Sequence, residues 1–138
     1  MGNMKKFTWL GLLFVLSLIL TSCGGGGGAS KSIKVTMTDF KFSPDKFTVP
    51  AGQEITLSAT NNGAVTHDFI IMKLGADVGD NYDAADEGNV YWKIEVPAGQ
   101  NTSVTLTAPA DPGEYQVICG VPGHYVAGMV ATLVVVTQ

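Results

Sequence analysis

Three residues that can bind a metal lie close together near the C-terminus, at Cys119, His124 and Met129. They are spaced Cys-x4-His-x4-Met, in a segment rich in glycine. Soft sulfur ligands combined with imidazole favour copper, and two histidines, one cysteine and a weak axial methionine are typical of an electron-transfer copper site. The chain has two histidines in all. Such a site would therefore need both, with His67 as the second imidazole.

Each of these residue types also has an ordinary structural role. A single cysteine or methionine usually packs as a hydrophobic side chain, and a single histidine is usually not a ligand. The combination favours a metal site, because ligation explains an unpaired Cys119 in an exported protein. Zinc could occupy the same two-histidine, one-cysteine set. A metal-free adhesion or binding domain would leave the spacing unexplained.

The elements that must position these residues are short β-branched runs. No apolar 3.6-residue period persists for three turns after residue 30, and turn-forming residues separate the runs every 8–12 residues. His67 begins one run, Cys119 ends another and Met129 begins the last, which places the candidate ligands at one end of the fold. We expect an all-β sandwich or barrel of about eight strands, at residues 33–37, 47–49, 55–59, 67–72, 90–96, 104–107, 115–119 and 129–136.

Two further features of this domain lead to expectations. Phe40, Phe42 and Phe47 are expected to be core aromatics, at least in part. The acidic segment 74–89 is expected to be a loop with a helical turn near residues 82–86. We favour a solvated excursion over a docking patch for this segment, and it lacks the residue spacing of an EF-hand calcium loop.

The first 30 residues predict export and membrane attachment. Residues 1–22 combine two early lysines with a short apolar stretch, as in a signal peptide. The sequence Leu20-Thr21-Ser22-Cys23 resembles a bacterial lipobox, which predicts acylation of Cys23; the alternative is ordinary secretion, with Cys23 present by chance. A glycine run follows, so residues 23–30 are expected to be a lipidated flexible tether, and residues 31–138 the folded domain.

Charge and composition exclude other classes. The chain has 138 residues, a formal net charge of −4, 46% hydrophobic and 14% charged residues, and its basic residues are all lysine. Such a chain is not disordered throughout. Binding of nucleic acid is not expected either, because phosphate recognition depends on arginine and positive potential.

Residues 31–138 resemble the cupredoxins, or blue copper proteins. The resemblance rests on the strand histidine, the Cys-His-Met loop, Phe40-x-Phe42-x-Pro44 and Pro112-Gly113-Glu114-Tyr115. The loop lengths, lipobox and glycine tether are similar to those of the auracyanin group of this family. The resemblance implies a Greek-key sandwich with one type 1 copper, bound by the four residues His67, Cys119, His124 and Met129.

The resemblance also suggests which residues surround the copper. Many cupredoxins have asparagine where this chain has Asp68, whose charge near the copper is expected to lower the reduction potential. Asp68 and Gly120 are candidates for the layer behind the ligands. An apolar collar around His124 would serve either as loop packing or for docking of redox partners; it comprises Val121, Pro122, Val126 and Ala127.

The function that the resemblance implies is electron transfer without catalysis. A monomeric carrier, lipid-anchored on the periplasmic face of the membrane, would take electrons from a membrane quinol oxidoreductase. It would pass them to a reaction-centre c-type cytochrome in a photosynthetic chain. A respiratory shuttle or a periplasmic copper carrier or storage module could use the same ligands. A copper enzyme would need further histidines and an open coordination position.

Overall fold

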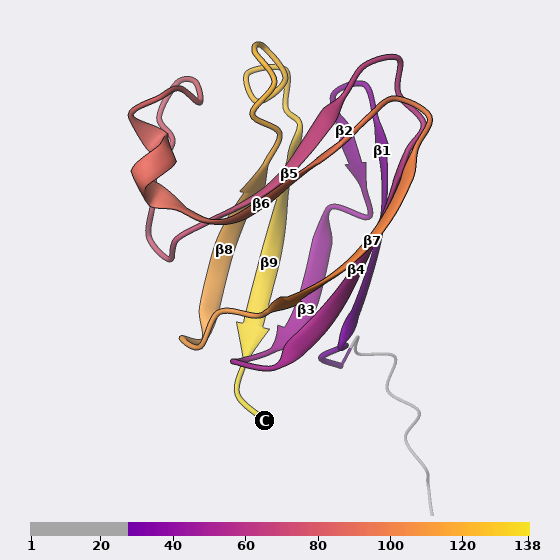
Figure 1. Ribbon diagram of the computed structural model, residues 1–138. Coiled ribbons are helices and arrows are strands. Elements are labelled where there is room, and N and C mark those ends of the chain that lie inside the picture. The colour runs from indigo at the N-terminus through magenta and orange to yellow at the C-terminus, as the bar shows by residue number, and fades with distance from the viewer. Residues whose placement is uncertain (1–27) are drawn as a thin grey trace, which may run out of the picture.

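The computed structural model describes residues 28–138 (Figure 1). The predicted signal peptide, the predicted lipidation site at Cys23 and most of the predicted tether lie outside the described residues. Within residues 28–138, no helix has the length and apolar character needed to cross a membrane. The elements are β1 (Ser32–Thr38), β2 (Lys41–Ser43), β3 (Lys46–Pro50), β4 (Glu54–Asn61), β5 (His67–Met72), the 3-10 helix η1 (Asp86–Asn89), β6 (Val90–Val96), β7 (Asn101–Thr107), β8 (Gly113–Ile118) and β9 (Val130–Val136).

The nine strands form two mixed sheets that pack face to face (Figure 1). One sheet has the order β2-β1-β4-β7, and the other has the order β3-β9-β8-β5-β6. The pairs β1–β4 and β3–β9 are parallel, and the remaining pairs are antiparallel. The predicted all-β sandwich is confirmed. The expected eight runs correspond to eight of the strands, and β2 is the additional one, too short at three residues to give a pattern.

Alternating side chains of the strands build the core between the sheets. In β1 the inward residues Ile33, Val35 and Met37 are buried, while their polar neighbours face outward. This period of two is what a sheet with one buried face requires. Phe42 packs edge-on against Phe69, with ring centroids 5.6 Å apart. Burial of this apolar surface is the main force that fixes the sandwich.

Two expectations for residues outside the regular strands need correction. Phe42 and Phe47 are in the core, but Phe40 is 50% exposed because it lies in the turn after β1, where the strand alternation no longer applies. The helical turn in the acidic segment was expected near residues 82–86, but the structure places it at residues 86–89, as η1. Asp86 is buried there, and its carboxylate accepts the Asp83 backbone N–H. The acidic segment is therefore held by a hydrogen bond at Asp86, although its other carboxylates are exposed.

Three connections meet at one end of the sandwich (Figure 1). They are the β1–β2 turn, the β4–β5 loop and the long β8–β9 loop, which are residues 39–40, 62–66 and 119–129. The acidic segment between β5 and β6 projects beside this end. The candidate ligands come from the first residue of β5 and from the β8–β9 loop.

Candidate metal centre

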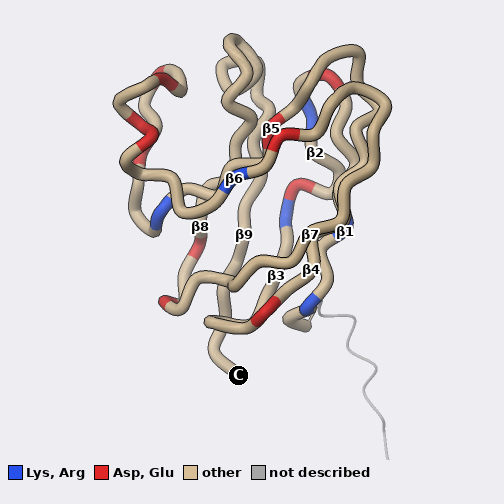
Figure 2. Tube along the Cα trace, in the orientation of Figure 1, with Lys and Arg blue, Asp and Glu red and all other residues tan. Residues whose placement is uncertain are grey.

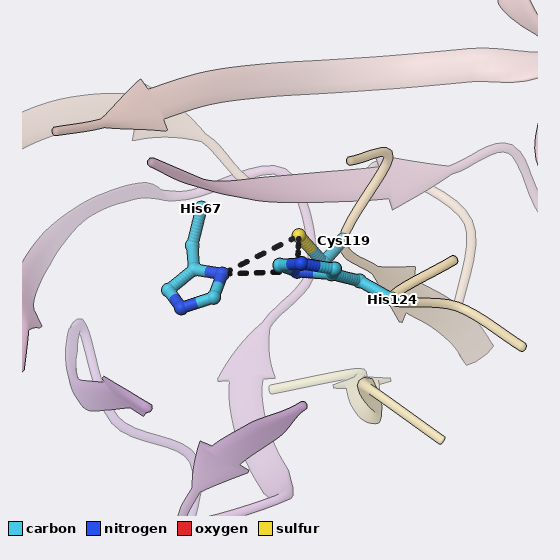
Figure 3. Close-up of side chains that lie close together, drawn as sticks. All are labelled: His67, Cys119 and His124. Carbon is cyan, nitrogen blue, oxygen red and sulfur yellow. Dashed lines mark hydrogen bonds between the residues drawn. The ribbon is translucent and has the colours of Figure 1, made fainter. Parts of the chain in front are cut away.

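The structure brings together the three predicted ligands with ring nitrogen or thiol donors. His67 Nδ1 and His124 Nδ1 are 3.2 Å apart, and Cys119 Sγ lies 3.9 Å and 3.5 Å from them, respectively (Figure 3). His67 and Cys119 are fully buried, and His124 is 8% exposed. Cys119 is a free thiol. Three donors from two distant parts of the chain thus face one point inside the protein.

The spacing of these donors fits a single metal ion. Metal–nitrogen bonds of about 2.05 Å and a metal–sulfur bond of about 2.3 Å, arranged trigonally, place nitrogen atoms about 3.5 Å apart and nitrogen and sulfur about 3.8 Å apart. The observed separations of 3.2, 3.5 and 3.9 Å match this pattern.

The backbone of Met129 is hydrogen-bonded to two residues of the triangle, His124 and Cys119. Its N–H donates to His124 O at 2.9 Å, and its carbonyl accepts the Cys119 N–H at 3.2 Å. Its side chain is fully buried. The fourth predicted ligand therefore belongs to the same cluster. The donor set of two imidazoles, a thiolate and a thioether suits copper.

Hydrogen bonds within the β8–β9 loop hold its ligands in place. The His124 N–H donates to Val121 O at 3.0 Å, and the Ala127 N–H donates to Gly123 O at 3.0 Å. Gly123 has a φ of 84°, a conformation that glycine adopts without strain. Backbone hydrogen bonds within the β8–β9 loop therefore fix its conformation.

Asp68 contacts the site with its backbone. Its N–H donates to Cys119 Sγ at 3.4 Å, which stabilises negative charge on the sulfur. Burial raises the pKa of the Cys119 thiol, and the N–H groups of Asp68 and Val121 oppose that rise. Burial also raises the pKa of the Asp68 carboxyl, against an opposing effect of the Gly120 N–H. The predicted effect of Asp68 on the potential stays a prediction.

Close packing behind the cysteine leaves little room for a side chain at Gly120. A Cβ at this position would lie 2.8 Å from Ile70 Cδ1 and 2.9 Å from Tyr82 Cε1. Tyr82 comes from the acidic segment, and its hydroxyl donates to Glu87 Oε1 at 2.9 Å. Glu87 also pairs with Lys93 at 2.8 Å. The acidic segment therefore packs against the metal loop, which the sequence did not indicate.

Three residues around His67 were not singled out by the sequence pattern: Asp39, Asn61 and Gly63. Asn61 is fully buried; its side-chain amide donates to Val65 O and Val96 O, and its carbonyl accepts the Gly63 N–H, all at 2.8 Å. It therefore fixes the loop that leads into His67. Burial and the neighbouring His124 lower the pKa of His67, and Asp39 opposes this. The turn sequence Asn61-Asn62-Gly63 indicated only that the chain reverses here.

The predicted collar is partly at the surface. Pro122, Val126 and Ala127 are exposed, whereas Val121 packs against the main core. Phe40 lies beside this surface, with its ring edge-on to His124 at 5.1 Å between centroids. The β8–β9 loop contains no charged residue, and in Figure 2 the charges lie on other elements. The part of the surface that the β8–β9 loop forms around the His124 ring is therefore neutral and largely apolar.

The fold and the donor set define a class: small β-sandwich proteins with a single buried copper site. Residues 29–136 match the model of the copper-binding proteins of the plastocyanin/azurin family. This chain therefore belongs to the plastocyanin/azurin family.

Individual relatives agree with this assignment. The chain is 35% identical over 144 residues to auracyanin-A of Chloroflexus aurantiacus, which covers 84% of this chain and 88% of that protein. It is 29% identical over 121 residues to the copper-resistant cuproprotein CopI of Rubrivivax gelatinosus, covering 81% and 70%. The solved structure of dithionite-reduced auracyanin from the photosynthetic bacterium Roseiflexus castenholzii superposes with a TM-score of 0.67 and 30% identity, covering 79% of this chain and 99% of that chain.

Proposed function

We propose that this protein is a one-electron carrier that uses one type 1 copper bound by His67, Cys119, His124 and Met129. The observation that supports this most strongly is the triangle of donors at 3.2, 3.5 and 3.9 Å, buried at the end of a rigid sandwich. Copper bound there supplies the Cu(II)/Cu(I) couple. A copper ion bound by all four side chains would have no open coordination position for a substrate, which favours a carrier over an enzyme.

The protein contributes a fixed ligand geometry. His67 begins a strand paired on both sides within its sheet, and Cys119 follows β8 directly. The loop hydrogen bonds at Val121 and Gly123 keep His124 from moving away. Ligands that stay in place in both oxidation states keep the reorganisation on electron transfer small. The N–H of Asp68 supports the charge of the thiolate in both states.

His124 is the proposed exit for the electron. It is the one ligand among the three triangle residues that reaches the surface, at 8% exposure. The exposed collar residues Pro122, Val126 and Ala127 surround it with a neutral surface. A small apolar contact of this kind suits brief redox encounters.

We also propose where the carrier works. Acylation at Cys23 would attach it to the periplasmic face of the membrane, and the glycine tether would let the domain move between partners. A membrane quinol oxidoreductase would be the donor and a c-type cytochrome of a reaction centre the acceptor. Support comes from the auracyanin relatives, both from organisms described as photosynthetic.

A periplasmic copper carrier or storage module is the second candidate. It is favoured by the relative described as a copper-resistant cuproprotein. The two functions differ in exchange of the metal: a carrier of copper must release it, whereas an electron carrier must retain it through many redox cycles.

The test is repeated reduction and oxidation of the copper-loaded full-length protein in the presence of an excess of a Cu(I) chelator. We expect the copper to stay bound while the protein exchanges electrons rapidly with a small redox mediator. Transfer of the copper to the chelator within the first cycles would favour the copper carrier instead.

A further inference from the structure

The two ring nitrogens of His67 have different surroundings. Nδ1 faces Cys119 and His124, and Nε2 points away from them (Figure 3). Nε2 is buried, and no residue within 28–138 provides it with a well-aligned hydrogen bond. The acceptor within reach is the Asp39 carboxylate, whose Oδ1 is 3.2 Å away. The Asp39 side chain is 46% exposed, so its carboxylate has room to turn toward Nε2.

Asp39 is held in this position by the chain around it. It lies in the β1–β2 turn, and its Oδ1 also accepts the Ala64 N–H at 3.1 Å. One carboxylate oxygen therefore connects two loops and the ring of a metal ligand.

Gly63 allows the approach between His67 and Asp39. A Cβ at this position would collide with His67 Nε2 and would lie 2.6 Å from Asp39 Oδ1. The backbone of Gly63 thus covers the gap between the nitrogen and the carboxylate. Reduced access of water strengthens an electrostatic interaction of this kind.

We propose that Asp39 is a positioning residue of the copper site: its carboxylate accepts the Nε2–H of His67, leaves Nδ1 free to bind the metal, and stabilises Cu(II) relative to Cu(I). A second hydrogen-bond partner commonly fixes the tautomer and raises the basicity of a histidine ligand. A negative charge behind the ligand favours the more positive metal ion. This inference rests on the proposed copper site.

The experiment compares copper-loaded full-length protein with Asp39→Asn and with the control Asp111→Asn. Asp39→Asn removes the charge but retains the shape and an acceptor oxygen. Asp111→Asn makes the same change of charge in the exposed loop before β8, at the opposite end of the sandwich from the metal loop. Affinities for Cu(II) and Cu(I), and the reduction potential, are measured for all three proteins.

We expect Asp39→Asn to weaken Cu(II) binding about tenfold and Cu(I) binding much less. A tenfold change in their ratio raises the one-electron potential by about 59 mV. The control is expected to leave the ratio unchanged. Equal potentials for Asp39→Asn and Asp111→Asn would overturn the proposal, provided that the wild-type protein binds copper as a blue site. Absence of that site in the wild-type protein would overturn the proposed function itself.

A second measurement starts from the wild-type protein, where the protonation of His67 can be read without any variant. In the reduced, diamagnetic wild-type protein, nitrogen-15 NMR should show His67 protonated at Nε2, with a proton that exchanges slowly with water. Asp39→Ala should speed up this exchange. A His67 ring without a proton on Nε2, or a proton that exchanges equally fast in the wild-type protein and in Asp39→Ala, would contradict the role of Asp39.

Discussion

Replacement of Gly63 by alanine should disturb the copper site through steric contact. A Cβ at position 63 would collide with His67 Nε2 and would lie 2.6 Å from Asp39 Oδ1 and 3.1 Å from Asn61 Oδ1. Cβ contacts below 3.0 Å essentially do not occur, so atoms must move. The Asp39 carboxylate is half-exposed and has room to move aside, whereas the His67 and Asn61 side chains are fully buried and have little.

The size of the effect follows from this packing. Insertion of one methyl group into a filled site costs about 1–3 kcal/mol. In a domain of this size that lowers the Tm by roughly 5–20 °C. Displacement of His67 should also weaken copper binding by about 10- to 100-fold, as loss of support for a metal ligand usually does.

The assay is thermal unfolding and Cu(II) titration of the Gly63→Ala protein beside Gly88→Ala. Gly88 is exposed, and a Cβ at that position meets nothing within 4 Å. Neither glycine has a positive φ, so the pair isolates the steric contact from backbone strain. Stabilities of Gly63→Ala and Gly88→Ala that both stay within about 0.5 kcal/mol of the wild-type value, together with equal copper binding, would refute the steric role of Gly63.

Three further changes test the surrounding structure by chemical denaturation. Phe40 has a φ of 65°, so Phe40→Gly should be about 1 kcal/mol more stable than Phe40→Ala; the reverse order would show that the turn is unstrained. Asn61→Ala should lower the free energy of unfolding by about 2–4 kcal/mol, because it removes three hydrogen bonds of a fully buried side chain, one of them buried and two part-buried, and a loss below 1 kcal/mol would contradict this role. Burial raises the pKa of Tyr115, whose hydroxyl donates to Asp111 O at 2.7 Å. Its stabilising contribution is complete below the unfolded pKa of about 10 and is lost as pH rises through the folded pKa. Tyr115→Phe should cost about 1 kcal/mol near neutral pH and show a shallower alkaline loss of stability than the wild-type protein; identical alkaline slopes would count against it.

The metal ligands could be predicted because their chemistry is local in the sequence. Cys119, His124 and Met129 are of types that bind copper together, and they share one short loop. His67 was identified because the chain has one other histidine. The strands were predictable for a related reason, since their alternating burial is written directly in the residue pattern.

The residues that support the ligands depend on long-range approach of loops. Asp39 faces His67 only because the β1–β2 turn and the β4–β5 loop meet at the same end of the sandwich. Tyr82 covers Gly120 only because the acidic segment folds back onto the metal loop. Phe40 was expected to lie at least partly in the core because it is aromatic, but it lies in the turn after β1, where no sheet buries it.

The most direct measurement is the visible absorption and EPR spectrum of the full-length Cu(II) protein, beside Cys119→Ser and the matched control Cys23→Ser. A type 1 site predicts an intense blue thiolate-to-copper band with narrow copper hyperfine splitting. The band should bleach reversibly on reduction, disappear in Cys119→Ser and persist in Cys23→Ser. A colourless wild-type protein, or a spectrum that survives the loss of Cys119, would contradict the assignment of His67, Cys119, His124 and Met129 as the copper ligands.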